Sequence, residues 1–164
     1  MKSCARTRLA LLSMVLLAGV QIAACATAET DAGSVSALPA DKPIFKEYHG
    51  AQLYLLRQGD DDIVVFWGIS PLSGGEQGNV RCFIQDRNDR TVMGETQPFV
   101  DPCRSAWWAS DGRFLGYTRD ATEVPSSGPP LVRIPAEVRD GRVFLDDGYL
   151  QCLQNRRQDC ESRQ

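Results

Sequence analysis

Four cysteines between residues 82 and 160 place the strongest limit on how this chain can fold. Cys82, Cys103, Cys152 and Cys160 are an even set. Such a set favours two disulfides in an exported chain, and four cysteines allow three connectivities. A structural zinc site is the weaker alternative. The sequence has no Cys-x-x-Cys pair, and its only histidine, His49, is far from these cysteines in the chain.

The N-terminus indicates that the chain is exported. Lys2, Arg6 and Arg8 form a basic head before an apolar run over 9–24, which is the pattern of a secretory signal. The apolar run is short for a membrane span, which needs ~20 apolar residues. We therefore expect residues 1–24 to be a signal peptide of the lipoprotein type. The mature chain is then expected on the periplasmic side of a bacterial membrane.

Two processing sites compete at the end of this signal. The run IAAC over 22–25 is a lipobox, which predicts a lipid on Cys25 and anchoring of the chain to the membrane. The run ATA over 26–28 is an ordinary small-x-small cleavage site, which would release a soluble protein without Cys25. We favour the lipid anchor, because a cysteine at the end of the apolar run is hard to explain otherwise.

The remainder is long enough for one domain. Residues 25–41 are rich in Ala, Ser, Thr and Gly, and we expect a flexible tether there. We expect a β domain over 42–148 with a loop-rich tip over about 70–117, and a tail over 149–164. The net charge of −3 becomes about −6 once the three basic residues of the signal are removed. This charge argues against nucleic acid or an anionic membrane face as a partner.

Short β-rich runs and the near absence of helical periodicity predict an all-β class. The runs 51–57 and 63–68 flank a polar turn, which predicts a hairpin. The runs 131–139 and 142–146 flank Asp140-Gly141, a dipeptide that accepts the positive φ angles of a type I′ turn. Further strands are expected at 81–84, 91–93 and 114–117. The last dozen residues are expected to be a short helix or an irregular tail.

Two spaced loop segments carry the most informative residues. The first reads QGNVRC over 77–82 and the second reads DPCRSA over 101–106, followed by WWASDGR, a Pro-rich SSGPPL over 126–131 and the Asp-Gly hairpin. This order resembles the Rieske iron–sulfur family, especially the Rieske proteins of cytochrome bc complexes, over about 46–147. In that family the loops read C-x-H-x-G-C and C-P-C-H-G-S. The resemblance implies stacked antiparallel sheets with a disulfide-braced tip.

The resemblance also implies that the cluster site is degenerate. The four ligand positions of the family fall, in chain order, on Gln77, Asn79, Asp101 and Arg104. The two non-ligand cysteines, which form a disulfide in the family, fall on Cys82 and Cys103. A Rieske centre needs two thiolates and two imidazoles, and this chain has one histidine. We therefore expect no 2Fe-2S cluster, no other cofactor and no metal.

Three pairs of residues each allow two interpretations. Asp101 and Arg104 are either an ion pair or two solvated loop residues. Cys152 and Cys160 are expected to form a local disulfide, the alternative being a reactive thiol pair. Trp107 and Trp108 are neighbours, so on a strand they face opposite ways. One is expected to pack inward, and the other could anchor a partner protein.

These features predict a cell-envelope protein without a catalytic constellation. We expect a non-catalytic structural, accessory or assembly module, for example of a respiratory complex, with a protein partner and a lipid anchor on Cys25. One alternative is an electron-transfer oxidoreductase subunit of the Rieske type. Another is a thiol–disulfide redox protein.

Overall fold

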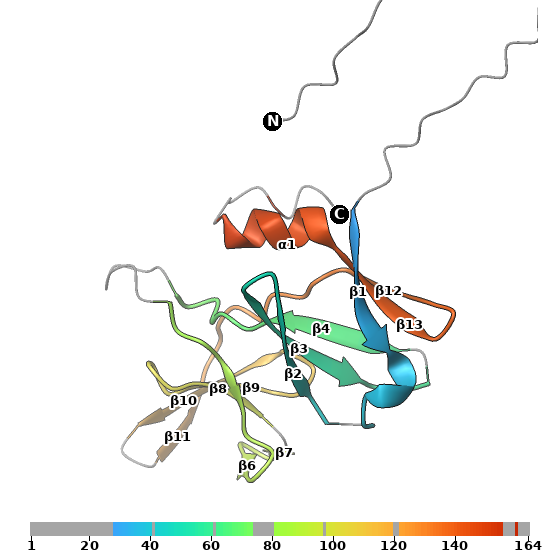
Figure 1. Ribbon diagram of the computed structural model, residues 1–164. Helices are drawn as coiled ribbons and strands as arrows, with labels where there is room; N and C mark the ends of the chain where they lie inside the picture. The colour runs from blue at the N-terminus through green and yellow to red at the C-terminus, as the bar shows by residue number, and fades with distance from the viewer. Residues whose placement is uncertain are drawn as a thin grey trace, which may run out of the picture.

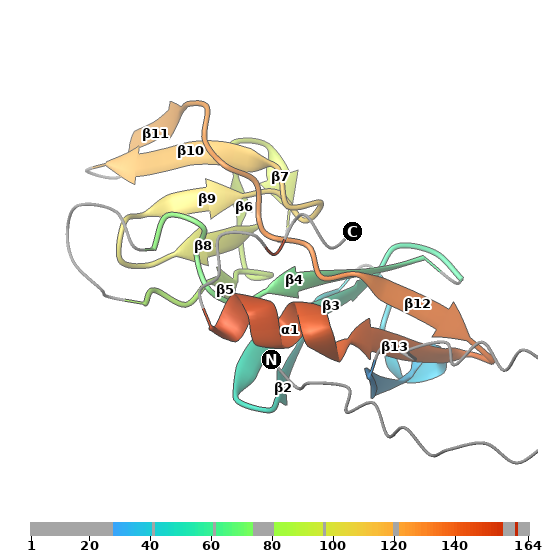
Figure 2. The same ribbon diagram turned by 90° about the horizontal axis from the view of Figure 1, so that it is seen from above.

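The computed structural model describes residues 28–40, 42–60, 62–73, 81–96, 98–119, 122–155 and 160. These residues form antiparallel β-sheets and one α-helix near the C-terminus, so the predicted all-β class is confirmed (Figure 1). Two three-stranded sheets and the helix lie on one side of the molecule. A five-stranded sheet lies on the other side, as Figure 2 shows from above.

The first predicted hairpin is present. β3 (Ala51–Arg57) pairs with β4 (Ile63–Trp67), and β2 (Ile44–Tyr48) adds an edge strand to β3. β3 lies between two hydrophobic cores, because Leu53 and Leu55 belong to one core and Tyr54 to the other. The sequence pattern does not predict β2, since only the first and last residues of this strand are even half-buried.

The second predicted hairpin is also present. It consists of β12 (Ala136–Arg139) and β13 (Arg142–Asp146). Asp140 and Gly141 connect them with φ angles of 51° and 70°, both positive as a type I′ turn requires.

The third strand of this sheet lies where the composition predicts a flexible tether. β1 (Glu29–Ser34) pairs along its length with β13, and a 3₁₀ helix (Val35–Ala37) follows it. Ala32, Val35 and Leu38 are buried in the same core as Leu53. The tether prediction over 25–41 is therefore wrong for this stretch. Its order comes from pairing with a strand near the C-terminus, which no local pattern reveals.

The tip carries the five-stranded antiparallel sheet, in the order β11-β10-β9-β8-β5. Its strands are β5 (Gln85–Asp86), β8 (Phe99–Asp101), β9 (Ala106–Trp108), β10 (Phe114–Arg119) and β11 (Thr122–Pro125). Beside it, β6 (Thr91–Val92) and β7 (Glu95–Thr96) form a small hairpin. The strands expected at 91–93 and 114–117 are thus present. Segment 81–84 instead holds only an isolated bridge from Phe83 to Ile69.

One helix, α1 (Asp147–Gln154), follows β13 directly. Asp146 caps this helix by accepting a hydrogen bond from the backbone N–H of Tyr149 at 2.9 Å. Tyr149, Leu150 and Cys152 are buried, so the tail predicted over 149–164 begins inside a packed helix. No helix in the described ranges is long and apolar enough to cross a membrane.

Tyr54 ties the tip to the β2-β3-β4 sheet. Its hydroxyl donates a hydrogen bond to the carbonyl of Ile84 at 2.9 Å, and its ring meets Phe99 edge-on with 5.2 Å between centroids. Burial raises the pKa of Tyr54 to about 12, and the charge of Asp86 adds to this rise. The hydroxyl therefore stays protonated in the folded state over a pH range in which the unfolded chain ionises it.

We expect the Tyr54→Phe substitution to lower the free energy of unfolding at pH 7 by about 1 kcal/mol, because the buried Ile84 carbonyl loses its donor. The raised pKa stabilises the wild type fully below pH ~10, and this contribution is lost as the pH rises from ~10 to ~12. In urea unfolding between pH 7 and 11, the free energy of unfolding of the wild type should fall towards that of the variant as the pH rises. An advantage that stays constant over this range would contradict the assignment.

Candidate functional site

A disulfide links the two loop segments of the tip. Cys82, just before β5, is bonded to Cys103, in the turn after β8, with 6.2 Å between their Cα atoms. This is the bond that the family resemblance implies. It closes a loop across 21 positions of sequence, which in the chain-entropy model stabilises the fold by about 3 kcal/mol.

The carboxylate of Asp101 organises the turn that carries Cys103. Asp101 is the last residue of β8 and is fully buried. Its Oδ1 accepts hydrogen bonds from the backbone N–H groups of Cys103 at 2.8 Å and Arg104 at 3.3 Å. Ser105 completes the turn with a φ of 54°. An aspartate that accepts from the backbone two residues ahead is a common way to hold a tight turn.

Arg104 neutralises this buried carboxylate. Its Nη1 lies 3.4 Å from Oδ2 of Asp101, and 24% of the Arg104 side chain is exposed. Of the two sequence-based alternatives, the structure has the ion pair rather than two solvated residues. Asp101 thus has partners for both carboxylate oxygens, which a buried charge requires.

Cys82, Asp101 and Cys103 form the one group of potential metal ligands found among the described residues. Their ligand atoms lie within 4.8 Å of one another. The two sulfurs are bonded to each other, so neither is a thiolate, and the carboxylate is held by Arg104 and the turn. A guanidinium has no lone pair to offer a metal.

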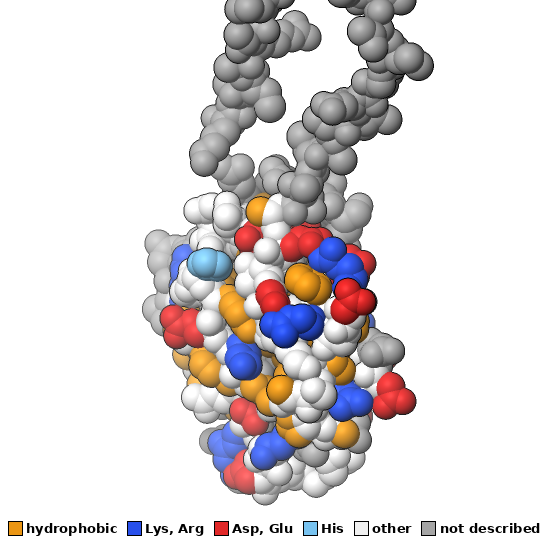
Figure 3. Space-filling view, turned by 45° about the vertical axis from the view of Figure 1, so that its right-hand side comes forward, with side chains coloured by type: hydrophobic (Ala, Val, Ile, Leu, Met, Phe, Trp, Pro, Cys, Tyr) orange, Lys and Arg blue, Asp and Glu red, His pale blue; other side chains and the backbone are white. Residues whose placement is uncertain are grey.

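The residues at the tip therefore do not fit a Rieske cluster. The two imidazoles that it needs are missing, because the only histidine, His49, lies in the turn between β2 and β3. Figure 3 shows this histidine at the surface. Its carbonyl accepts a hydrogen bond from Gln154 of α1 at 2.8 Å. The other two positions where the resemblance puts ligands, Gln77 and Asn79, lie outside the described residues.

The expectation of a tryptophan docking anchor is wrong. Trp108 is fully buried, and Trp107 is 6% exposed. They do face opposite ways: Trp108 packs with Phe114 and donates to the carbonyl of Pro129 at 2.9 Å, whereas Trp107 belongs to a separate small core. β9 lies in the middle of its sheet with side chains covering both faces, so no tryptophan reaches the surface.

Phe83 is an exposed aromatic residue of the tip that is not identified from the sequence. It is 41% exposed and lies between two buried residues, Cys82 and Ile84. The alternation of buried and exposed residues could have predicted that Phe83 is exposed, because neighbours on an extended segment point to opposite sides.

The second disulfide joins Cys152 of α1 to Cys160, with 5.7 Å between Cα atoms. Both cysteines are buried. They lie in the core shared with β1 and β13, not in the one that contains Trp108. This bond fixes the end of the described chain to the helix. The predicted lipidation site, Cys25, lies outside the described residues.

Comparisons with known proteins bear on the fold. No family model matches the chain, and no curated protein matches it. Among solved structures, the oxygenase–ferredoxin complex of carbazole 1,9a-dioxygenase is similar over 73% of this chain and 28% of that chain, at 10% identity and a TM-score of 0.50. The fold is therefore Rieske-like, as the loop motifs imply.

Two smaller proteins are similar over nearly their whole length. A Mycobacterium tuberculosis protein described as the small subunit of an NADH-dependent nitrite reductase shares 21% identity over 72% of this chain and 93% of that chain, at a TM-score of 0.41. The Escherichia coli protein NirD shares 15% identity over 71% of this chain and 93% of that chain, at a TM-score of 0.39.

A double-mutant cycle should detect the pair at the tip. Asp101→Ala should cost about 2–3 kcal/mol of unfolding free energy, because two backbone donors lose their acceptor. Arg104→Met should cost about 1 kcal/mol, and the coupling between the two substitutions should be about 1 kcal/mol. Urea unfolding of the four proteins measures this coupling. Strictly additive costs would show that Arg104 does not neutralise Asp101.

Proposed function

We propose that this chain is a Rieske-fold module without an iron–sulfur cluster that serves a protein partner as a structural, accessory or assembly component. One observation carries the proposal: the Asp101–Arg104 ion pair lies at two of the positions where the resemblance puts cluster ligands. The loops are also cross-linked by the Cys82–Cys103 disulfide, as they are in the family that the motifs resemble. They can therefore keep their shape without iron between them.

The chemistry of these residues supports the proposal. Both oxygens of Asp101 already accept hydrogen bonds, and its exposed fraction is zero. Binding iron there would require the carboxylate to give up Arg104, whose cation would then lie beside the metal. Such an arrangement is unfavourable in a site with little water, since like charges repel strongly there.

A second candidate is an electron-transfer module of the Rieske type. The comparisons favour this candidate, because the similar structures belong to oxidoreductase systems and one of them is an oxygenase in a reduced complex with ferredoxin. That likeness also supports a protein partner for this chain. A shared fold does not by itself carry the function of its relatives, so the ligand set decides between the two candidates.

Iron content separates the two candidates. We expect untagged protein, purified from cells grown with iron, to contain far less than one iron per chain. We also expect its reduced form to give no cluster signal in electron paramagnetic resonance. The matched control is Asp101→Ala, which should remain equally iron-free. Two irons per chain with a reducible spectrum would overturn the first candidate and establish the second.

We also propose that the chain is exported and held at the membrane by a lipid on Cys25. β1 begins at Glu29, and the carbonyl of Ala28 accepts a hydrogen bond from Asp147 of α1 at 3.0 Å. Only residues 26–28 would then separate the lipid from the domain, a reach of about 10 Å. The start of β1 and the β8–β9 turn lie on opposite sides of the domain (Figures 1 and 2). The tip would accordingly face away from the membrane.

This arrangement can be measured by paramagnetic broadening in nanodiscs with nitroxide-labelled headgroups. The amide signals of Thr30, Asp31 and Asp147 should broaden, and those of Cys103 and Ser105 should not. A domain of this size is roughly 35 Å across, so its two ends are distinguishable.

Two variants control this experiment. A twenty-residue Gly-Ser insertion after Thr27 should remove the difference between the two ends. Cys25→Ser should remain soluble after fractionation of cells. A Cys25→Ser protein that still fractionates with membranes would contradict the lipid anchor, and equal broadening at both ends would contradict the orientation.

A further inference from the structure

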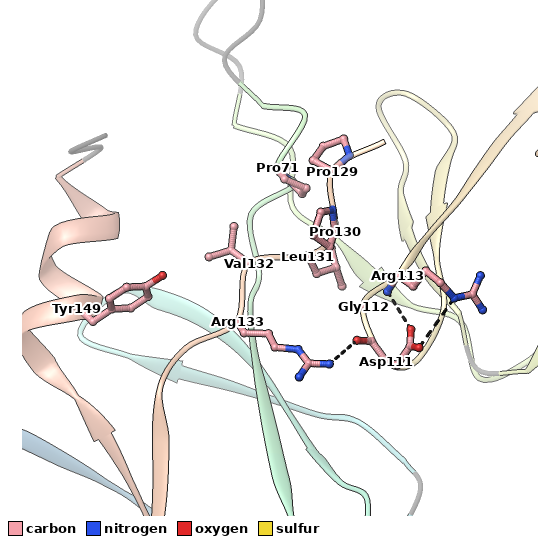
Figure 4. A pocket seen from close by; sticks show the side chains of 10 residues that line it. All are labelled: Pro71, Asp111, Gly112, Arg113, Pro129, Pro130, Leu131, Val132, Arg133 and Tyr149. Carbon is pink, nitrogen blue, oxygen red and sulfur yellow. Dashed lines mark hydrogen bonds and ion pairs between the residues drawn. The ribbon is translucent and has the colours of Figure 1, made fainter. Parts of the chain in front are cut away.

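A pocket lies between α1 and the loop that leads from β11 to β12. Its volume is about 860 Å³, which is within the range of small-ligand sites. Figure 4 shows Tyr149 of α1 facing the loop across the pocket, with the turn 111–113 beside Arg133. The lining residues are Pro71, Asp111, Gly112, Arg113, Pro129, Pro130, Leu131, Val132, Arg133 and Tyr149.

The loop wall of this pocket is apolar and firmly held. The N–H of Leu131 donates to the carbonyl of Gly112 at 2.9 Å, and the carbonyl of Val132 accepts from Trp67 at 2.9 Å. The carbonyl of Pro129 accepts from the indole of Trp108 at 2.9 Å. Prolines also restrict the backbone. A wall fixed in this way loses little entropy when a ligand binds.

Arg133 supplies an uncompensated cation at the edge of the apolar wall. Its side chain is exposed, its Nη2 donates to the backbone carbonyl of Asp111 at 3.0 Å, and its guanidinium lies 5.9 Å from the centre of the Phe66 ring. Within the described ranges no carboxylate forms an ion pair with it. Arg113 differs, because Glu95 at 2.5 Å and Asp111 at 3.9 Å balance its charge.

From this combination we infer that the pocket binds a ligand with an apolar body and a terminal carboxylate, which pairs with Arg133. A guanidinium fork matches the two oxygens of a carboxylate better than any other side chain does. The apolar body contacts Pro130, Leu131 and Val132. This chemistry is shared by a free organic acid and by the C-terminus of a polypeptide that ends in an apolar residue.

The site is separate from the tip pair described above. None of its lining residues is Asp101, Arg104 or a cysteine. The inference therefore does not depend on whether the chain binds iron, and its test does not repeat the iron measurement.

Titration of ¹⁵N-labelled protein tests the site with two probes. Octanoate represents the free acid, and acetyl-Gly-Ala-Leu with a free carboxylate represents a polypeptide end. At least one probe should shift the amide signals of Gly112, Val132 and Arg133, with saturation at millimolar concentration or below. Octanoate alone would identify a free acid as the ligand source, and the tripeptide alone a polypeptide C-terminus.

Two sets of controls make the result decisive. 1-Octanol and the tripeptide amide lack the carboxylate and should bind about tenfold more weakly than their acids. Arg133→Gln should weaken the acids by about the same factor, whereas Arg119→Gln, which changes an exposed arginine outside the pocket, should not. Thermal melts confirm that both variants fold. The inference is overturned if neither acid binds, if the neutral analogues bind equally well, or if Arg133→Gln binds like the wild type.

Discussion

The tip of this molecule depends on one buried carboxylate. Asp101 ends β8, holds the turn that presents Cys103, and is neutralised by Arg104. The disulfide to Cys82 then attaches this turn to the segment before β5. Asp101 accepts hydrogen bonds from the backbone of this turn and also pairs with Arg104. The turn and the disulfide therefore stabilise each other, and neither requires a metal ion between the loops.

The loops of this Rieske-like scaffold do not need a metal ion to keep their shape. The two loops need something that keeps them together, and here the Cys82–Cys103 bond does so, while the Asp101–Arg104 ion pair stabilises the turn of the second loop. Two hydrophobic cores also hold the sheets: one around Leu53, which lies outside the tip, and one around Phe66 and Trp108, which joins the tip to the β2-β3-β4 sheet. Replacing ligand residues therefore changes the chemistry of the loops without removing what stabilises the domain.

Local signals predicted the parts of the structure that are local. Asp140-Gly141 identified a hairpin because two adjacent residues determine its turn. The order of the loop segments 77–82 and 101–106 identified the tip through a family resemblance. β1 is not predicted because its partner strand is distant in the sequence. Only one of Trp107 and Trp108 is expected to pack inward, whereas both are buried, Trp108 in a core that includes residues as distant as Phe66. Arg133 was missed for the same reason: its partners, the turn at Asp111 and the ring of Phe66, come from other parts of the chain.

The pairing of β1 with β13 affects when the domain can fold during its synthesis. Glu29 lies opposite Asp146, so the first strand of the domain finds its partner only when nearly the whole chain is present. Until then Ala32 and Val35 have no core to enter. Contacts of such long range form late and slowly. A chain built in this way remains incompletely folded during synthesis, which is the condition in which a polypeptide can be threaded through a narrow channel.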